Sequence, residues 1–72
     1  MTGTQLRNIR RNKLIKSDRF GFNVCFSQSD LAQAIGRGYQ RVMAWEALGD
    51  KPIPDFADKL VGDYCKSHNI KL

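Results

Sequence analysis

The side chains best suited to recognition chemistry are three consecutive hydrogen-bonding residues, Tyr39, Gln40 and Arg41. The amide of Gln40 carries a donor and an acceptor that match an adenine edge, and the Arg41 guanidinium matches a guanine edge or a phosphate. The Tyr39 hydroxyl can bond a phosphate, or its ring can pack on a neighbouring helix. These residue types favour binding chemistry over covalent chemistry.

Residue types used in catalysis and metal binding are scattered along the chain. The cysteines, Cys25 and Cys65, lie forty residues apart, and His68 is the single histidine. This spacing leaves a zinc site short of ligands, and we interpret the cysteines as reduced thiols of a cytoplasmic protein. We expect neither catalysis nor a metal or other cofactor, because no nucleophile, base and orienting group occur together. The acidic residues of the last predicted helix also lack a partner histidine: Asp55, Asp58 and Asp63.

The positive charge is concentrated at one end of the sequence. The 72 residues include 12 basic and 7 acidic ones, and the net charge is +5. Residues 1–19 alone balance to +5, which places the whole excess on the first element. Their basic residues are Arg7, Arg10, Arg11, Lys13, Lys16 and Arg19. Such a cluster is the electrostatic footprint of a protein that binds a polyanion, although a solvated basic helix has the same composition.

The composition predicts a single domain over residues 1–72, with apolar residues forming 42% of the chain. No apolar run approaches the roughly 20 residues of a membrane span, so we expect no membrane partner. A first helix is predicted over Gln5–Lys16, capped by Thr4. A last helix is predicted to begin near Pro54 and to carry an apolar stripe: Phe56, Ala57, Leu60, Val61 and Tyr64.

Two short helices are predicted between these ends. Ser27 followed by Asp30 is a capping-box pattern, which predicts a helix over Gln28–Ile35. The glycines of residues 36–38 break that helix, and another follows over about Tyr39–Ala47. Two short helices joined by a glycine-containing turn form a helix-turn-helix. The apolar residues at the required spacing are Leu31, Ala32 and Ile35 on the first helix and Val42 and Trp45 on the second.

This segment resembles the Cro/repressor-type (XRE-like) helix-turn-helix family of phage and bacterial transcriptional regulators. The string Ser27-Gln28-Ser29-Asp30-Leu31-Ala32-Gln33-Ala34-Ile35-Gly36 is similar to the opening helix of the family. Val42, Trp45-Glu46 and Pro52 follow in register, and Leu6-x-x-Ile9-Arg10 extends the likeness upstream to about two-thirds of the chain. The departures are Arg37 where the family usually has an apolar residue, Gly38 where it has a Ser or Thr cap, and the Phe20–Phe26 insertion.

The resemblance implies an all-α domain of four to five helices, with a short extended aromatic insertion between the first two. It implies a phage or prophage type of repressor that binds an inverted-repeat operator in double-stranded DNA as a homodimer, without a small-molecule effector. The small size is also similar to that of anti-CRISPR-associated autorepressors. The alternative is a protein-interaction module, such as an antitoxin or adaptor, whose helix-turn-helix is vestigial.

The resemblance also implies roles for individual residues. The helix over Tyr39–Ala47 would enter the major groove, and the expected base contacts are Tyr39, Gln40, Arg41, Met43 and Ala44. The expected phosphate contacts, which position the protein without reading sequence, are Gln28, Arg37, Lys51 and Arg11. Arg10 and Glu46 match the two residues of an internal salt bridge in the family. The alternative is that they are two independent surface charges.

The insertion alternates apolar with small or polar residues, and its apolar residues are Phe20, Phe22, Val24 and Phe26. Period-two alternation predicts an extended segment with one apolar face. Two interpretations stay open. The strip either provides apolar cover in place of the fifth helix of many relatives, or forms an ordered loop with one or two anchors. We assign Phe26 to the core and take Phe20 and Phe22 as candidates for the dimer contact.

Overall fold

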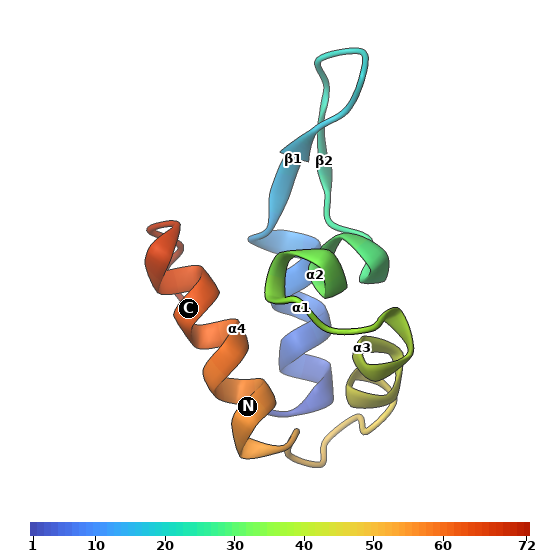
Figure 1. Ribbon diagram of the computed structural model, residues 1–72, viewed down its shortest axis with the longest axis vertical. Helices are drawn as coiled ribbons and strands as arrows, with labels where there is room; N and C mark the ends of the chain where they lie inside the picture. The colour runs from blue at the N-terminus through green and yellow to red at the C-terminus, as the bar shows by residue number, and fades with distance from the viewer.

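The computed structural model describes residues 1–72, which form four helices and one antiparallel two-stranded hairpin. The elements are α1 (Gly3–Asn12), β1 (Ile15–Ser17), β2 (Asn23–Cys25), α2 (Gln28–Ile35), α3 (Tyr39–Glu46) and α4 (Asp55–Ser67). The helices pack together, and the hairpin projects away from them between α1 and α2 (Figure 1). The fold is therefore mostly helical with a small sheet, and no helix is long and apolar enough to cross a membrane.

Helix α1 begins and ends earlier than the sequence pattern predicted. Thr2 caps it instead of Thr4: the Thr2 hydroxyl accepts from the Gln5 amide at 3.2 Å, and the Gln5 side chain accepts from the Thr2 amide at 2.8 Å. This reciprocal capping box satisfies two donors that would otherwise be free. The predicted end at Lys16 is also wrong. Leu14 is buried in the core, and the residues after it pair with β2.

The hairpin explains only part of the predicted aromatic strip. Residues 15–17 pair with residues 25–23 in antiparallel register, so the extended structure begins before the insertion and Phe20 and Phe22 fall in the connecting loop. They are 70% and 69% exposed, whereas Phe26 packs against the core and Val24 is half-buried. The strip is therefore an ordered loop with Phe26 as an anchor. It does not provide an apolar cover for the domain.

The remaining helices lie close to their predicted positions. Ser27 and Asp30 form the capping box of α2, and Gly36 ends this helix in the left-handed region at φ 70°, which glycine adopts without steric cost. Helix α3 ends at Glu46, one residue before the predicted boundary. Pro54 precedes α4 as its N-cap. Residues 69–72 add no fifth helix.

One apolar core joins all four helices. Its ten buried members are Leu6, Leu14, Leu31, Ala32, Val42, Trp45, Ile53, Ala57, Val61 and Cys65. The start of α1 lies against the end of α3 so closely that a Cβ atom on Gly3 would meet the Trp45 carbonyl oxygen at 2.4 Å. In the predicted stripe of α4, Ala57 and Val61 are buried, while Phe56 is 46% exposed and contacts the Trp45 ring edge-on.

Candidate nucleic-acid interface

Helices α2 and α3 are joined by the tight turn at residues 36–38. The Gly36 conformation lets the Arg37 amide donate back to the Ala32 carbonyl at 2.9 Å, which satisfies the open end of α2. Ala32 is only 3% exposed. Helices α2 and α3 pack against each other, so they are two short helices joined by a glycine-containing turn.

Helix α3 has one buried face and one exposed face. Val42, Trp45 and Glu46 are at most 4% exposed and face the body of the protein. The opposite face is exposed and contains Tyr39, Gln40, Arg41, Met43 and Ala44. These are the five predicted base-contacting residues, and all five are exposed to solvent.

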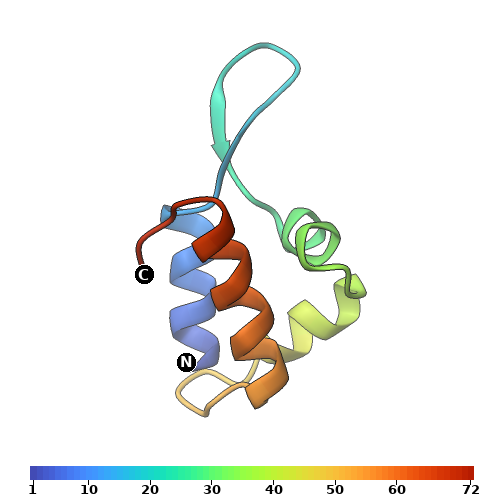
Figure 2. The ribbon, with the colours of Figure 1, turned by 60° about the vertical axis from the view of Figure 1, so that its left-hand side comes forward.

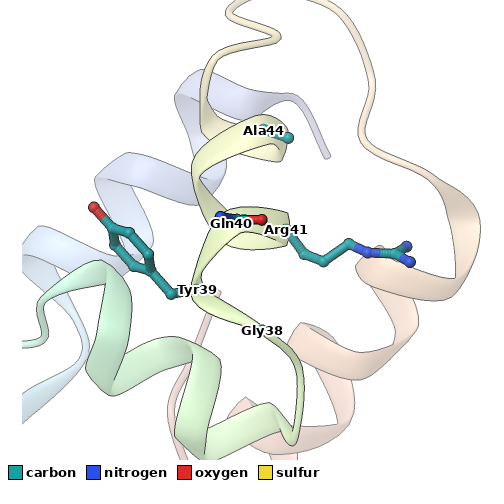
Figure 3. Close-up of a pocket in the computed structure, with 5 residues that line it drawn as sticks. All are labelled: Gly38, Tyr39, Gln40, Arg41 and Ala44. Atoms are coloured by element: carbon teal, nitrogen blue, oxygen red, sulfur yellow. The ribbon is translucent and has the colours of Figure 1, made fainter.

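The first turns of α3 line a hollow in the protein surface (Figure 3). Tyr39 and Arg41 point to opposite sides of the helix, and Gln40 lies between them with its amide directed outward. Ala44, one turn further on, and Gly38 add little bulk. The helix therefore presents a central amide flanked by a phenol and a guanidinium. Small residues above and below leave room for a flat ligand edge.

The buried carboxylate of Glu46 fixes α3 against the other helices. Arg10 of α1 binds it with two hydrogen bonds, from Nε at 2.7 Å and from Nη2 at 2.9 Å. The Glu46 side chain is 1% exposed and that of Arg10 is 12% exposed, so the pair lies inside the protein. The predicted Arg10–Glu46 pair is thus an internal salt bridge, and the alternative of two independent surface charges does not apply.

Two further contacts extend this network. The third nitrogen of the Arg10 guanidinium, Nη1, donates to the Phe26 carbonyl at 2.9 Å, and this bond connects the base of the hairpin to α1. The Gln28 amide donates to Glu46 at 3.2 Å, which ties the first residue of α2 to the last of α3. The hydrogen bonds to Glu46 raise the pKa of Arg10. Arg10 therefore stays charged, and its charge is used inside the fold.

Comparison with known protein families, with curated proteins and with solved structures found no match.

The predicted phosphate contacts occupy different settings. Gln28 uses one amide hydrogen on Glu46, which leaves its second amide hydrogen and the helix N-terminus for a ligand. Arg37 is exposed beside α3, with its guanidinium 5.9 Å from the centre of the Phe56 ring. Lys51 is exposed in the loop before α4, and Arg11 is exposed on α1. Arg37 is thus the basic residue of this set that adjoins α3 in the chain.

The positive charge does not form one basic helix, as the sequence had suggested. Arg7, Arg10 and Arg11 lie on α1, Lys16 lies on β1, and Arg19 lies in the hairpin loop. Arg10 is paired with Glu46. Lys16 is paired with Asp30 of α2 at 2.8 Å, and this bond is the main cause of the lowered pKa of Asp30.

The sequence analysis missed two contacts at Glu46 and one in the hairpin loop. Arg7 lies 3.6 Å from the Glu46 carboxylate, and its position three residues before Arg10 was the available signal. The link from Gln28 to Glu46 had no signal in the local sequence, because the two residues meet only in the folded chain. Arg19 places its guanidinium 4.9 Å from the centre of the Phe20 ring.

Proposed function

We propose that this chain is a sequence-specific double-stranded-DNA-binding protein, a transcriptional regulator of the repressor type, with α3 as its recognition helix. The observation that carries the proposal is the division of α3 into two faces. Its inner face is held by buried Val42, Trp45 and Glu46, while its exposed residues include Gln40 and Arg41, whose side chains suit base edges. A helix that is packed on one face and exposed on the other, next to a second helix, matches the requirements of major-groove docking.

The outer face supports a division of roles among its residues. Gln40 lies at the centre of the hollow and suits an adenine edge, while Arg41 suits a guanine edge or a phosphate. Met43 and Ala44 offer apolar contacts for a thymine methyl group. Tyr39 and the N-terminus of α2 suit phosphate groups on either side, and such contacts position the helix.

A homodimer on an inverted repeat completes the proposal. One helix of eight residues reaches too few base pairs to specify a single genomic site, because each recognition helix contacts only a few bases. Two-fold symmetry doubles the site and makes it palindromic.

Selection of bound sequences from a random double-stranded DNA pool tests the proposal. The full chain should enrich a palindromic site and lose affinity steeply as salt rises, because phosphate contacts release counterions. Gln40→Ala and Arg41→Ala should each relax preference at one position per half-site, by about 1–3 kcal/mol for a good base contact. Arg37→Ala should weaken all sequences alike and reduce the salt slope by about one.

Lys59→Ala is a control, because Lys59 is an exposed cation on α4 outside the helix-turn-helix. It should leave the selected sequence unchanged. If Gln40→Ala and Arg41→Ala change only stability and keep the same sequence preference, α3 is not the recognition helix.

The second candidate, a protein-interaction module, is favoured by one observation, the exposed phenylalanines of the hairpin loop. Such a module would show only weak binding that does not distinguish the selected site from random DNA. The same competition therefore separates the two functions.

A further inference from the structure

The hairpin loop is ordered by its own hydrogen bonds, although no other element covers it. One carboxylate oxygen of Asp18 accepts from the backbone amides of Phe20, at 2.8 Å, and Phe22, at 2.9 Å. The Asp18 amide donates back to the Phe22 carbonyl at 2.9 Å, and Gly21 takes φ 82° to close the turn. The backbone of this loop is therefore held in one conformation, which reduces the backbone entropy lost on binding.

What the loop presents is aromatic and cationic. Phe20 and Phe22 are the most exposed large hydrophobic residues of the chain, at 70% and 69%. The Arg19 guanidinium lies over the Phe20 ring and has no acidic partner. The carboxylate of Asp18 is engaged with the loop backbone. The end of the hairpin, residues 19–22, is thus two aromatic rings beside an unpaired positive charge.

This surface is too small to hold two copies of the chain together by itself. A phenylalanine side chain buries about 150–250 Å², so the exposed parts of Phe20 and Phe22 amount to roughly 200–350 Å² per chain. Two loops packed on each other would bury roughly 400–700 Å², below the approximately 1,200 Å² of a stable protein interface. A narrow ligand that accepts an inserted ring and a guanidinium fits the area better.

The base of the hairpin is attached to the N-terminal end of α2. Lys16 of β1 pairs with Asp30 in the first turn of α2, and Phe26 continues the strand pairing through its amide to the Leu14 carbonyl. Figures 1 and 2 both place α2 between the hairpin loop and α3 along the long axis of the molecule. The hairpin loop and α3 therefore lie on opposite sides of α2 along this axis.

We propose that residues 19–22 insert into the minor groove of the DNA next to the major-groove site of α3. This inference rests on the proposed function. With α3 in the major groove and the α2 N-terminus over a phosphate strand, the far side of that strand is the minor groove. Arginine is attracted to a narrow, A·T-rich minor groove, and phenylalanine is one of the residues that wedge between base steps there. The expected consequence is a preference for A·T-rich sequence outside the half-sites read by α3.

Hydroxyl-radical footprinting of the full chain on its selected DNA tests the inference, with the double variant Phe20→Ser/Phe22→Ser and with Arg19→Gln. Wild type should protect a flanking minor-groove segment in addition to the α3 site. Both variants should lose the flanking protection and the A·T preference while they keep the protection of the α3 site. The double variant should also bind roughly fivefold or more weakly, because it has lost the stacking of two rings. Cys25→Ser is the matched control, since Cys25 is exposed on the same hairpin outside its loop, and it should behave as wild type.

The other outcomes are equally distinct. If the double variant keeps the full footprint and affinity, the hairpin does not contact DNA, and the proposed function stands without it. A different result is that the double variant sediments as a monomer, yet still protects the flanking segment when it is bound to DNA with a single half-site. The loop then contacts a second copy of the chain, and the inference is wrong. If wild type enriches no sequence, the proposed function fails first and the inference fails with it. The melting temperatures of all variants should match wild type, because the changed side chains are exposed.

Discussion

Removal of the Glu46 carboxylate should destabilise the protein more than any change on its surface. Glu46→Ala leaves the Arg10 guanidinium, which is 12% exposed, without its ionic partner, and leaves the Gln28 amide without its acceptor. Breaking a buried ion pair from one side costs about 3–5 kcal/mol, because a charge remains in a poorly hydrated place. A 72-residue domain has a total stability of about 4–11 kcal/mol at the usual value per residue. The variant should therefore lose at least about a quarter of the stability of the domain, and all of it if the total lies at the low end of that range.

Urea unfolding followed by circular dichroism measures this loss, with an unchanged m-value showing that the two states are still comparable. In a thermal scan the loss corresponds to a Tm decrease of more than about 10 °C for a domain of this size. Glu46→Gln, which keeps an acceptor oxygen without the charge, should lie between wild type and Glu46→Ala. The control is Lys16→Met, which breaks a pair whose side chains are 44% and 22% exposed and should cost under about 1 kcal/mol. A loss of unfolding free energy below about 1 kcal/mol in Glu46→Ala would show that the Glu46 carboxylate does not hold α3 against the other helices.

Two further predictions concern stability. Gly3→Ala should lower Tm, because its Cβ would press on backbone atoms at 2.4 and 2.9 Å, and overpacking of roughly 1–3 kcal/mol outweighs the helix propensity that alanine adds. Gly62→Ala, in the middle of α4 with nothing within 4 Å of the added atom, should raise stability by about 0.5–1 kcal/mol, so equal signs for the two changes would contradict the packing argument. Lys16 lowers the pKa of Asp30, so this pair stabilises the fold above the unfolded carboxyl pKa of about 3.9 and loses that effect as pH falls through the lower folded-state pKa. The difference in unfolding free energy between wild type and Lys16→Met should accordingly shrink in acid, and a difference that stays constant down to pH 2 would show that Asp30 does not titrate through this bond.

The part of the fold closest to the candidate site could be predicted because its signals are local. Ser27 and Asp30 stand at capping-box spacing, and Gly36 marks the turn within nine residues of that cap. The exposed face of α3 follows from which of its residues are apolar, since Val42 and Trp45 define the buried side. Helical periodicity fixes the opposite side once the buried side is known.

The first third of the chain was harder to predict for two physical reasons. Thr2 and Thr4 are both suitable caps, and only the hydrogen bonds of Gln5 select Thr2. The strand Ile15–Ser17 has three residues, too few for a period to be recognised. Its extended form depends on pairing with residues 23–25. The local sequence does not show this pairing, because residues 15 and 16 also continue the helical pattern of α1. The alternation of the phenylalanines was present, but the loop reverses the chain before Phe20 and Phe22 can share a sheet face with Phe26.

Composition also overstates how much charge is available to a polyanion. Among the six basic residues of the first 19, Arg10 and Lys16 form ion pairs inside the chain, and Arg7 lies near the carboxylate that Arg10 already binds. Arg11 and Arg19 have no acidic partner, and they lie on α1 and at the end of the hairpin. A phosphate-binding surface would therefore use cations from several elements, with Arg11 of α1 and Arg37 beside α3 among them. Each phosphate contact contributes about 0.9 to the slope of log affinity against log salt, so this slope should fall by about that amount when Arg11 or Arg37 is replaced alone. If Arg10→Met still folds, it should leave the salt slope unchanged, because the charge of Arg10 is already compensated by Glu46.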